Sequence, residues 1–193
     1  MKTEQHFIQR LEGSLAAIAS LHHQLGQLAE IAQLIIQRLQ NGGCVYTAGN
    51  GGSAAQALHL AEELIGRYRG DRAPLRAVCL NADPTALTCI ANDFGFDQVF
   101  ARQCQALLTE RDVLIVFSTS GQSPNIVNAL GAAKSCGSLS VGFLGRGGGA
   151  SSALCDRSIM VPDPFTDSAQ IQEVHQVILH LICEALELHF KAR

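Results

Sequence analysis

Five short apolar runs are separated along the chain by segments with helical periodicity. The runs are CVYTAG at 44–49, AVCLN at 77–81, VLIVFS at 113–118, SVGFLG at 140–145 and SIMVP at 158–162. Strands that are continuously apolar are typical of parallel sheets covered on both faces, and the helices between them provide the parallel connections. The sequence therefore predicts an α/β fold with a doubly wound, five-stranded parallel sheet.

Helical periodicity predicts most of the remaining elements. Residues 4–40 indicate an N-terminal helical region, with a possible break at Gly26. The other expected helices are 54–69, 98–109, 123–136 and 168–189; residues 89–96 read as helix or loop, and 146–151 as a flexible loop. No linker is evident, so we expect a single domain over 1–193, with N-terminal helices at 1–40 and an α/β core at 43–193.

Composition limits the possible classes of function. Of the 193 residues, 47% are hydrophobic, which is enough for a substantial core, and 16% are charged, which suggests that partner subunits cover part of the surface. The net charge of −3 argues against nucleic-acid binding, and no apolar run is long enough to span a membrane. The 7 cysteines form no Cys-x-x-Cys pair, which is typical of reduced thiols in a cytoplasmic protein.

Two turns that contain glycine follow the first and third predicted strands. They are GNGGS at 49–53 and STSGQS at 118–123, and each precedes a predicted helix. Glycine lets the backbone approach a ligand closely, and the free N–H groups of a helix N-terminus attract anions. Ligands of such sheets bind at the carboxyl ends of the strands. The two turns therefore predict a phosphate site made of N–H groups and hydroxyls.

Helix capping is the simpler interpretation of part of this pattern. Ser123 followed by Pro124 is an ordinary N-cap with proline in the first turn. Capping leaves Ser118, Thr119 and Ser120 unexplained. Neither turn is a Walker A loop, because no Gly-Lys-Ser/Thr follows, and the Gly-x-Gly-x-x-Gly fingerprint is absent after the first strand.

Two predicted helices carry polar residues among apolar ones. His59 and Glu63 are four residues apart and share one helix face, whereas Glu62 points elsewhere. Gln172 and His180 are eight residues apart, so they lie within about 80° of each other around the axis. Taken singly, such residues are more often a surface ion pair or a core histidine. Their combination indicates a metal or substrate site.

A carboxylate, an imidazole and a phosphate clamp together favour proton transfer on a sugar phosphate. Aldose–ketose isomerisation needs a base that moves a proton between adjacent carbons, and an acid or cation that stabilises the enediol-like intermediate. A Schiff-base mechanism is disfavoured, because Lys2, Lys134 and Lys191 all lie outside the two turns.

The chain resembles the sugar isomerase (SIS) fold and, within it, the phosphoheptose isomerases. The resemblance covers nearly the whole chain and depends on AGNGGSAAQALHLAEELIGRYR, ANDFGFDQVFARQ, DVLIVFSTSGQSPNIV and IQEVHQVILH. It implies a flavodoxin-like sheet and a homotetramer whose sites are shared between subunits. It also implies conversion of D-sedoheptulose 7-phosphate into D-glycero-D-manno-heptose 7-phosphate, the first step towards the ADP-heptose of the lipopolysaccharide core.

The resemblance also implies roles for individual residues. It places an acid–base pair at Glu63 and His180, and one zinc ion per subunit on His59, Glu63, Gln172 and His180. Substrate contacts are implied for Asn50, Gly51, Gly52, Ser53, Glu63, Asn92, Asp93, Ser118, Thr119, Ser120, Ser123 and Gln172.

This sequence departs from the family pattern at two places, and two other functions stay open. Residues 54–56 are Ala-Ala-Gln and residues 169–170 are Ala-Gln, whereas some family members carry different, polar residues at these places. The role of Arg67 is also open: it is either a substrate ligand or a surface charge. One alternative is a non-catalytic SIS protein that regulates replication initiation, but such a relative lacks the positions equivalent to Glu63 and His180. The other alternative is an isomerase that acts on a different sugar phosphate. Such isomerases usually carry additional domains.

Overall fold

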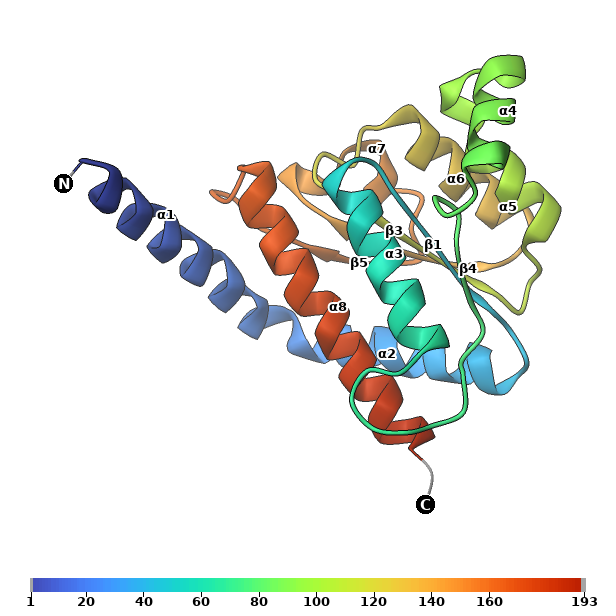
Figure 1. The fold of residues 1–193 in the computed structure, drawn as a ribbon, viewed down its shortest axis with the longest axis horizontal. Coiled ribbons are helices and arrows are strands. Elements are labelled where there is room, and N and C mark those ends of the chain that lie inside the picture. Colours follow the sequence, from blue (N-terminus) through green and yellow to red (C-terminus); the bar gives the residue numbers. More distant parts are fainter. Residues whose placement is uncertain (1, 192–193) are drawn as a thin grey trace.

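All five predicted strands form, and they pair into one parallel sheet (Figure 1). The computed structural model describes residues 2–191. The strands are β1 (Val45–Gly49), β2 (Ala77–Cys79), β3 (Val113–Ser118), β4 (Leu139–Leu144) and β5 (Arg157–Met160). Their order is β2-β1-β3-β4-β5, which is the doubly wound order of flavodoxin-like folds. The predicted fold class is therefore confirmed.

Helices precede the first strand, connect the strands and follow the last strand. The helices are α1 (Lys2–Ala19), η1 (Ser20–Gln24), α2 (Leu25–Gln40), α3 (Gly52–Ile65), α4 (Pro84–Phe94), η2 (Phe96–Gln98), α5 (Ala101–Leu107), α6 (Pro124–Ser135), η3 (Arg146–Gly148), α7 (Gly149–Ser152) and α8 (Ser168–Phe190). None of the helices in the described part of the chain is long and apolar enough to cross a membrane.

Two apolar layers hold these helices against the sheet. Successive residues of a strand point to opposite faces, so Ile115 and Phe117 of β3 pack beneath α2, α3 and α8, whereas Leu114 and Val116 pack against α5 and α6. All four side chains are fully buried. This is the physical reason why the third run is apolar at every position.

The N-terminal helices are interrupted at 20–24, and not at Gly26 as the sequence suggested. Gly26 lies inside α2, where the cost of a helical glycine, about 1 kcal/mol, is tolerated. The interruption lets the Gln24 amide donate to the Met160 carbonyl at 2.8 Å and accept from its N–H at 3.0 Å. The Gln24 side chain therefore covers the free edge of β5, a contact that no local sequence pattern signals.

The segment predicted as a flexible loop, 146–151, is an ordered turn (η3) whose residues lack the φ/ψ angles of a right-handed helix, followed by a single helical turn (α7). Gly147, Gly148 and Gly149 all have positive φ, and the Gly148 N–H donates to the Gly145 carbonyl at 2.9 Å. Glycine adopts such angles without a steric penalty, which allows η3 and α7 to follow each other directly.

His175 on α8 is fully buried beside Phe117, and its ring has no well-formed hydrogen bond within residues 2–191. Burial lowers the pKa of His175 to about 4, with a small opposing effect from the backbone of Leu144. The folded protein therefore holds this ring neutral at pH values where the unfolded chain binds a proton.

We expect acid to destabilise the fold through this residue. Between the unfolded pKa near 6.5 and the folded pKa, only the unfolded chain takes up the proton, so stability falls as the pH is lowered. Urea unfolding at pH 7.5 and pH 5 should differ by about 2 kcal/mol more in the wild type than in His175→Phe. The exposed-residue control His22→Gln should keep the wild-type pH dependence. An equal pH dependence in His175→Phe would contradict this account.

Candidate active site

The two turns that contain glycine lie side by side, because β1 and β3 are neighbours in the sheet. Gly49 at the end of β1 pairs with Phe117 near the end of β3. Asn50 and Asn125 join the turns through reciprocal amide hydrogen bonds, with Nδ2 to Oδ1 distances of 2.8 and 2.9 Å. This position is the switch point of the doubly wound sheet, where such folds bind ligands.

The 49–53 turn depends on glycine at two positions. Gly51 has a φ of 56° and is the N-cap of α3, an angle that L-residues rarely adopt. A Cβ on Gly49 would collide with the backbone of Ser53. Ser53 itself is buried, and Gly51 and Gly52 are exposed. The turn therefore presents backbone, and not side chains, at the N-terminus of α3.

The 118–123 turn is fixed by its own hydroxyl groups. The Gly121 N–H donates to Ser118 Oγ at 3.0 Å, and the Gln122 N–H donates to Ser120 Oγ at 3.2 Å. Ser123 is the N-cap residue of α6, but its side chain makes no capping hydrogen bond. Ser123 therefore does not use its hydroxyl to cap α6, and within residues 2–191 that hydroxyl makes no hydrogen bond that would compete with a ligand.

A second cluster lies between α3 and α8, which run side by side (Figure 1). His59 Nε2 is 3.1 Å from Glu63 Oε1, and the His59 and His180 ring centroids are 5.4 Å apart. The Tyr68 ring also lies beside His180, with 5.8 Å between the two ring centroids. The structure thus brings together three of the four predicted metal ligands, His59, Glu63 and His180.

The fourth predicted ligand, Gln172, lies towards the turns. Its side-chain amide is about 2.6 Å from where a Cβ on Gly52 would be. Its backbone carbonyl accepts a hydrogen bond from Gln56 Nε2 at 2.5 Å. Gln172 therefore lies beside the N-terminus of α3, and among the described residues it makes no hydrogen bond to His59, Glu63 or His180.

Asn92 and Asp93 lie apart from these residues, at the exposed end of α4. Asn92 Nδ2 donates to Asp93 Oδ1 at 2.8 Å, and neither side chain has a hydrogen bond to the two turns among the described residues. Their role in substrate binding stays a prediction.

The sequence interpretation missed Gln176. Its Nε2 is 2.9 Å from His59 Nδ1 and 3.1 Å from His180 Nε2, so it contacts both histidines. The available signal was its spacing of four residues before His180, which places the two on one helix face. Glu62 is exposed as expected, although its carboxylate lies within 4.8 Å of the His59 and Glu63 ligand atoms.

His59, Glu62 and Glu63 form a group whose ligand atoms all lie within 4.8 Å of one another, a spacing that suits a divalent cation. Neighbouring ligand atoms around tetrahedral zinc are roughly 3.3 Å apart, close to the 3.1 Å between His59 Nε2 and Glu63 Oε1. The side chains of His59 and Glu63 are 34% and 14% exposed, so the site is partly shielded while remaining open to a small ligand.

The fold and the site define a SIS domain, and a family model of that name matches residues 6–145. Phosphoheptose isomerase 1 of Campylobacter jejuni is 46% identical over 86% of this chain and 88% of that protein. The enzyme of Helicobacter pylori is 41% identical over 97% and 95%.

Solved structures of phosphoheptose isomerases are also similar to this chain. The phosphoheptose isomerase of Neisseria gonorrhoeae is 36% identical, with a TM-score of 0.85 over 97% of both chains. That of Francisella tularensis is 32% identical, with a TM-score of 0.92 over 97% of this chain and 100% of that chain. The chain belongs to the phosphoheptose isomerases, an enzyme family within the SIS-domain proteins.

Proposed function

We propose that this protein is an aldose–ketose isomerase that converts D-sedoheptulose 7-phosphate into D-glycero-D-manno-heptose 7-phosphate. The observation that carries the proposal is the cluster formed by His59 and Glu63 on α3, which begins at the 49–53 turn, with His180 on the neighbouring α8. The relatives named above are phosphoheptose isomerases, which supports the same substrate class.

The two turns would bind the substrate phosphate. The helices α3 and α6 both begin at this point of the sheet, and the positive ends of their dipoles favour an anion. The hydroxyls of Ser118, Thr119, Ser120 and Ser123 would add donors; Ser118 Oγ and Ser120 Oγ accept N–H groups of the turn and still have their own protons to donate. Asn92 and Asp93 would contact the sugar.

Glu63 would move the proton between C1 and C2 of the sugar. Its carboxylate is half-buried and is held by His59, so its position is defined before substrate binds. His180 would donate a proton to the oxygen of the enediol-like intermediate and remove it again. A general acid and a general base in these positions contribute about 10²–10⁴-fold each to the rate.

A divalent ion would be held by His59, Glu63, Gln172 and His180. Two imidazoles, a carboxylate and an amide suit zinc better than magnesium, which prefers an all-oxygen set. When bound, the ion supplies polarisation of the substrate carbonyl.

The product would enter the synthesis of ADP-heptose for the lipopolysaccharide core, in the cytoplasm. All 7 cysteines are free in the described structure, and burial raises the pKa of the Cys104, Cys155 and Cys183 thiols to about 12. Such thiols are unreactive, which fits a reducing compartment. Residues 1–193 would form a single SIS domain.

The activity is tested by incubating metal-loaded protein with sedoheptulose 7-phosphate and following the sugar by NMR. We expect an aldoheptose phosphate to form, and we expect His180→Ala to abolish its formation. If well-folded, metal-loaded protein does not turn the substrate over, the proposal fails.

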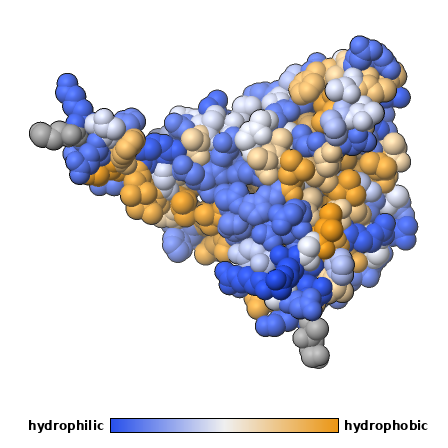
Figure 2. Space-filling view, viewed as in Figure 1, coloured by the Kyte–Doolittle hydropathy of each residue, from blue (hydrophilic) through white to orange (hydrophobic). Residues whose placement is uncertain are grey.

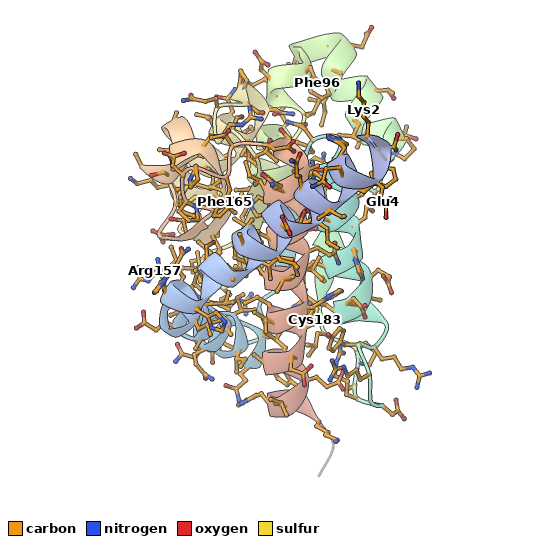
Figure 3. All side chains as sticks on the ribbon, turned by 90° about the vertical axis from the view of Figure 1, so that its left-hand side faces the viewer. Lys2, Glu4, Phe96, Arg157, Phe165 and Cys183 are labelled. Atoms are coloured by element: carbon orange, nitrogen blue, oxygen red, sulfur yellow. The ribbon has the colours of Figure 1, made fainter. Side chains whose placement is uncertain are left out.

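We also propose that the protein is a homotetramer in which α1 forms part of an interface. Phe7, Leu11 and Leu15 are 65%, 61% and 59% exposed and lie at a spacing of four residues on one face of α1. Figure 2 shows apolar side chains gathered along the arm that α1 forms. The other side of α1 crosses α8 (Figure 3), where Arg10 pairs with Glu173 at 2.9 Å.

A charge on the exposed face of α1 should weaken the assembly. We expect Leu11→Asp to shift the protein to smaller species in analytical ultracentrifugation, because each buried leucine contributes about 1.5–3 kcal/mol and symmetry repeats the loss in every subunit. Gln9→Asp, which adds the same charge to an exposed position of α1, is the control. An unchanged mass for Leu11→Asp would mean that this face is not an interface.

A further inference from the structure

Gln176 is the one side chain in the described structure that hydrogen-bonds to both histidines of the α3–α8 cluster. It is half-buried, and it approaches His59 from the side of the ring opposite to Glu63. Neither the proton transfer nor the ligand set proposed above gives Gln176 a role.

The orientation of the Gln176 amide and the positions of the imidazole protons depend on each other. An amide nitrogen donates and cannot accept, so His59 Nδ1 and His180 Nε2 both accept in this arrangement. A neutral His59 then carries its proton on Nε2, which donates to Glu63 Oε1 at 3.1 Å. In this tautomer Nε2 has no free lone pair for a cation.

Binding of a cation through His59 Nε2 requires the other tautomer. The proton then lies on Nδ1, which needs an acceptor at the 2.9 Å position now occupied by the Gln176 amide nitrogen. A half-turn of the amide group exchanges its nitrogen for its oxygen with almost no change of shape. The rotated oxygen also takes the position 3.1 Å from His180 Nε2, so His180 can offer that nitrogen to a cation only after its own ring turns away from the amide.

We propose that Gln176 is a positioning residue for the cation site, whose Oε1 accepts the His59 Nδ1–H and holds His59 in the tautomer with a ligating Nε2. Metal-binding histidines in proteins almost always donate their second N–H to such a partner, and loss of the partner weakens metal binding by about 10–100-fold. The inference rests on the proposed cation site at His59, Glu63 and His180.

The test measures zinc affinity by competition with a chromophoric chelator, without reference to activity. We expect Gln176→Met to bind zinc about 10–100-fold more weakly than the wild type. Gln176→Glu, which keeps an acceptor oxygen, should bind at least as tightly as the wild type. Gln170→Met is the matched control on the same helix, because its amide lies beside Gly13 of α1, and its affinity should not change.

A second measurement needs no substitution. Long-range ¹H–¹⁵N NMR of the zinc-bound wild type should show His59 protonated on Nδ1, whereas the metal-free protein should show it protonated on Nε2. Unchanged zinc affinity in folded Gln176→Met, or a zinc-bound His59 protonated on Nε2, would overturn the role of Gln176 and leave the isomerase proposal intact. Failure of the wild type to bind zinc would overturn the cation site itself, and this inference with it.

Discussion

Replacing Glu63 by glutamine should lower kcat by about 10²–10⁴-fold, because a neutral amide cannot take the proton from the sugar carbon. Glutamine has nearly the same shape and keeps an oxygen that can face a cation, so the variant should retain its metal. Glu63 cannot be a tight ligand and a free base at the same moment. We therefore propose that it loosens from the metal when substrate binds.

Metal content and turnover of the Glu63→Gln variant are measured on the same sample. Glu184→Gln is the control, since Glu184 lies one turn beyond His180 on α8 and pairs with Arg69 at 3.0 Å, outside the site. The Glu184→Gln variant should turn the substrate over at the wild-type rate. Loss of metal together with activity in Glu63→Gln would leave the dual role of this carboxylate without support.

Replacing Gly121 by alanine should unfold or severely destabilise the 118–123 turn. Gly121 has a φ of 61°, an angle that costs an L-residue about 1–2 kcal/mol. Its Cβ would also overlap the carbonyl oxygen of Gly148, which is backbone and is held by the 145–151 segment. Overall stability in urea should fall by more than about 2 kcal/mol, and the KM for a sugar phosphate should rise.

Gly131→Ala provides the matched control for this substitution. Gly131 lies inside α6, and a Cβ there would have no neighbour within 4 Å. Alanine is a better helix former, so this variant should be more stable by about 0.5–1 kcal/mol. Equal stability of Gly121→Ala and the wild type would contradict the described packing of the turn.

The strands and the core helices could be predicted from the sequence because burial on both faces leaves a continuous apolar signal. The 113–118 run, for example, coincides with β3. The interruption of the N-terminal helices could not be predicted, because it depends on the pairing of Gln24 with Met160, 136 residues away in sequence. The ordered turn and the short helix at 146–152 depend on positive φ angles at Arg146 and at three glycines, which an isolated Gly-rich string does not distinguish from a flexible loop.

Part of the candidate site could also be predicted, because helix spacing and strand order determine which of its residues lie together. Spacing on a helix predicted the pairing of His59 with Glu63, and strand order brings the two turns together. The contact of Gln176 with both histidines depends on how α3 packs against α8, and an amide in a helix carries no pattern of its own. Asn92 lies at the exposed end of α4, where its side chain has no hydrogen bond to the two turns among the described residues.

The central claim is that Glu63 transfers a proton between neighbouring carbons of a heptose phosphate. Its most direct test is to run the reaction in D₂O and measure deuterium at C2 of the aldose product by NMR. We predict that solvent deuterium enters C2 in the wild type and that Glu63→Gln forms no labelled product. An aldose product that keeps only protium at C2 over many turnovers would show a hydride shift instead, and would contradict the account.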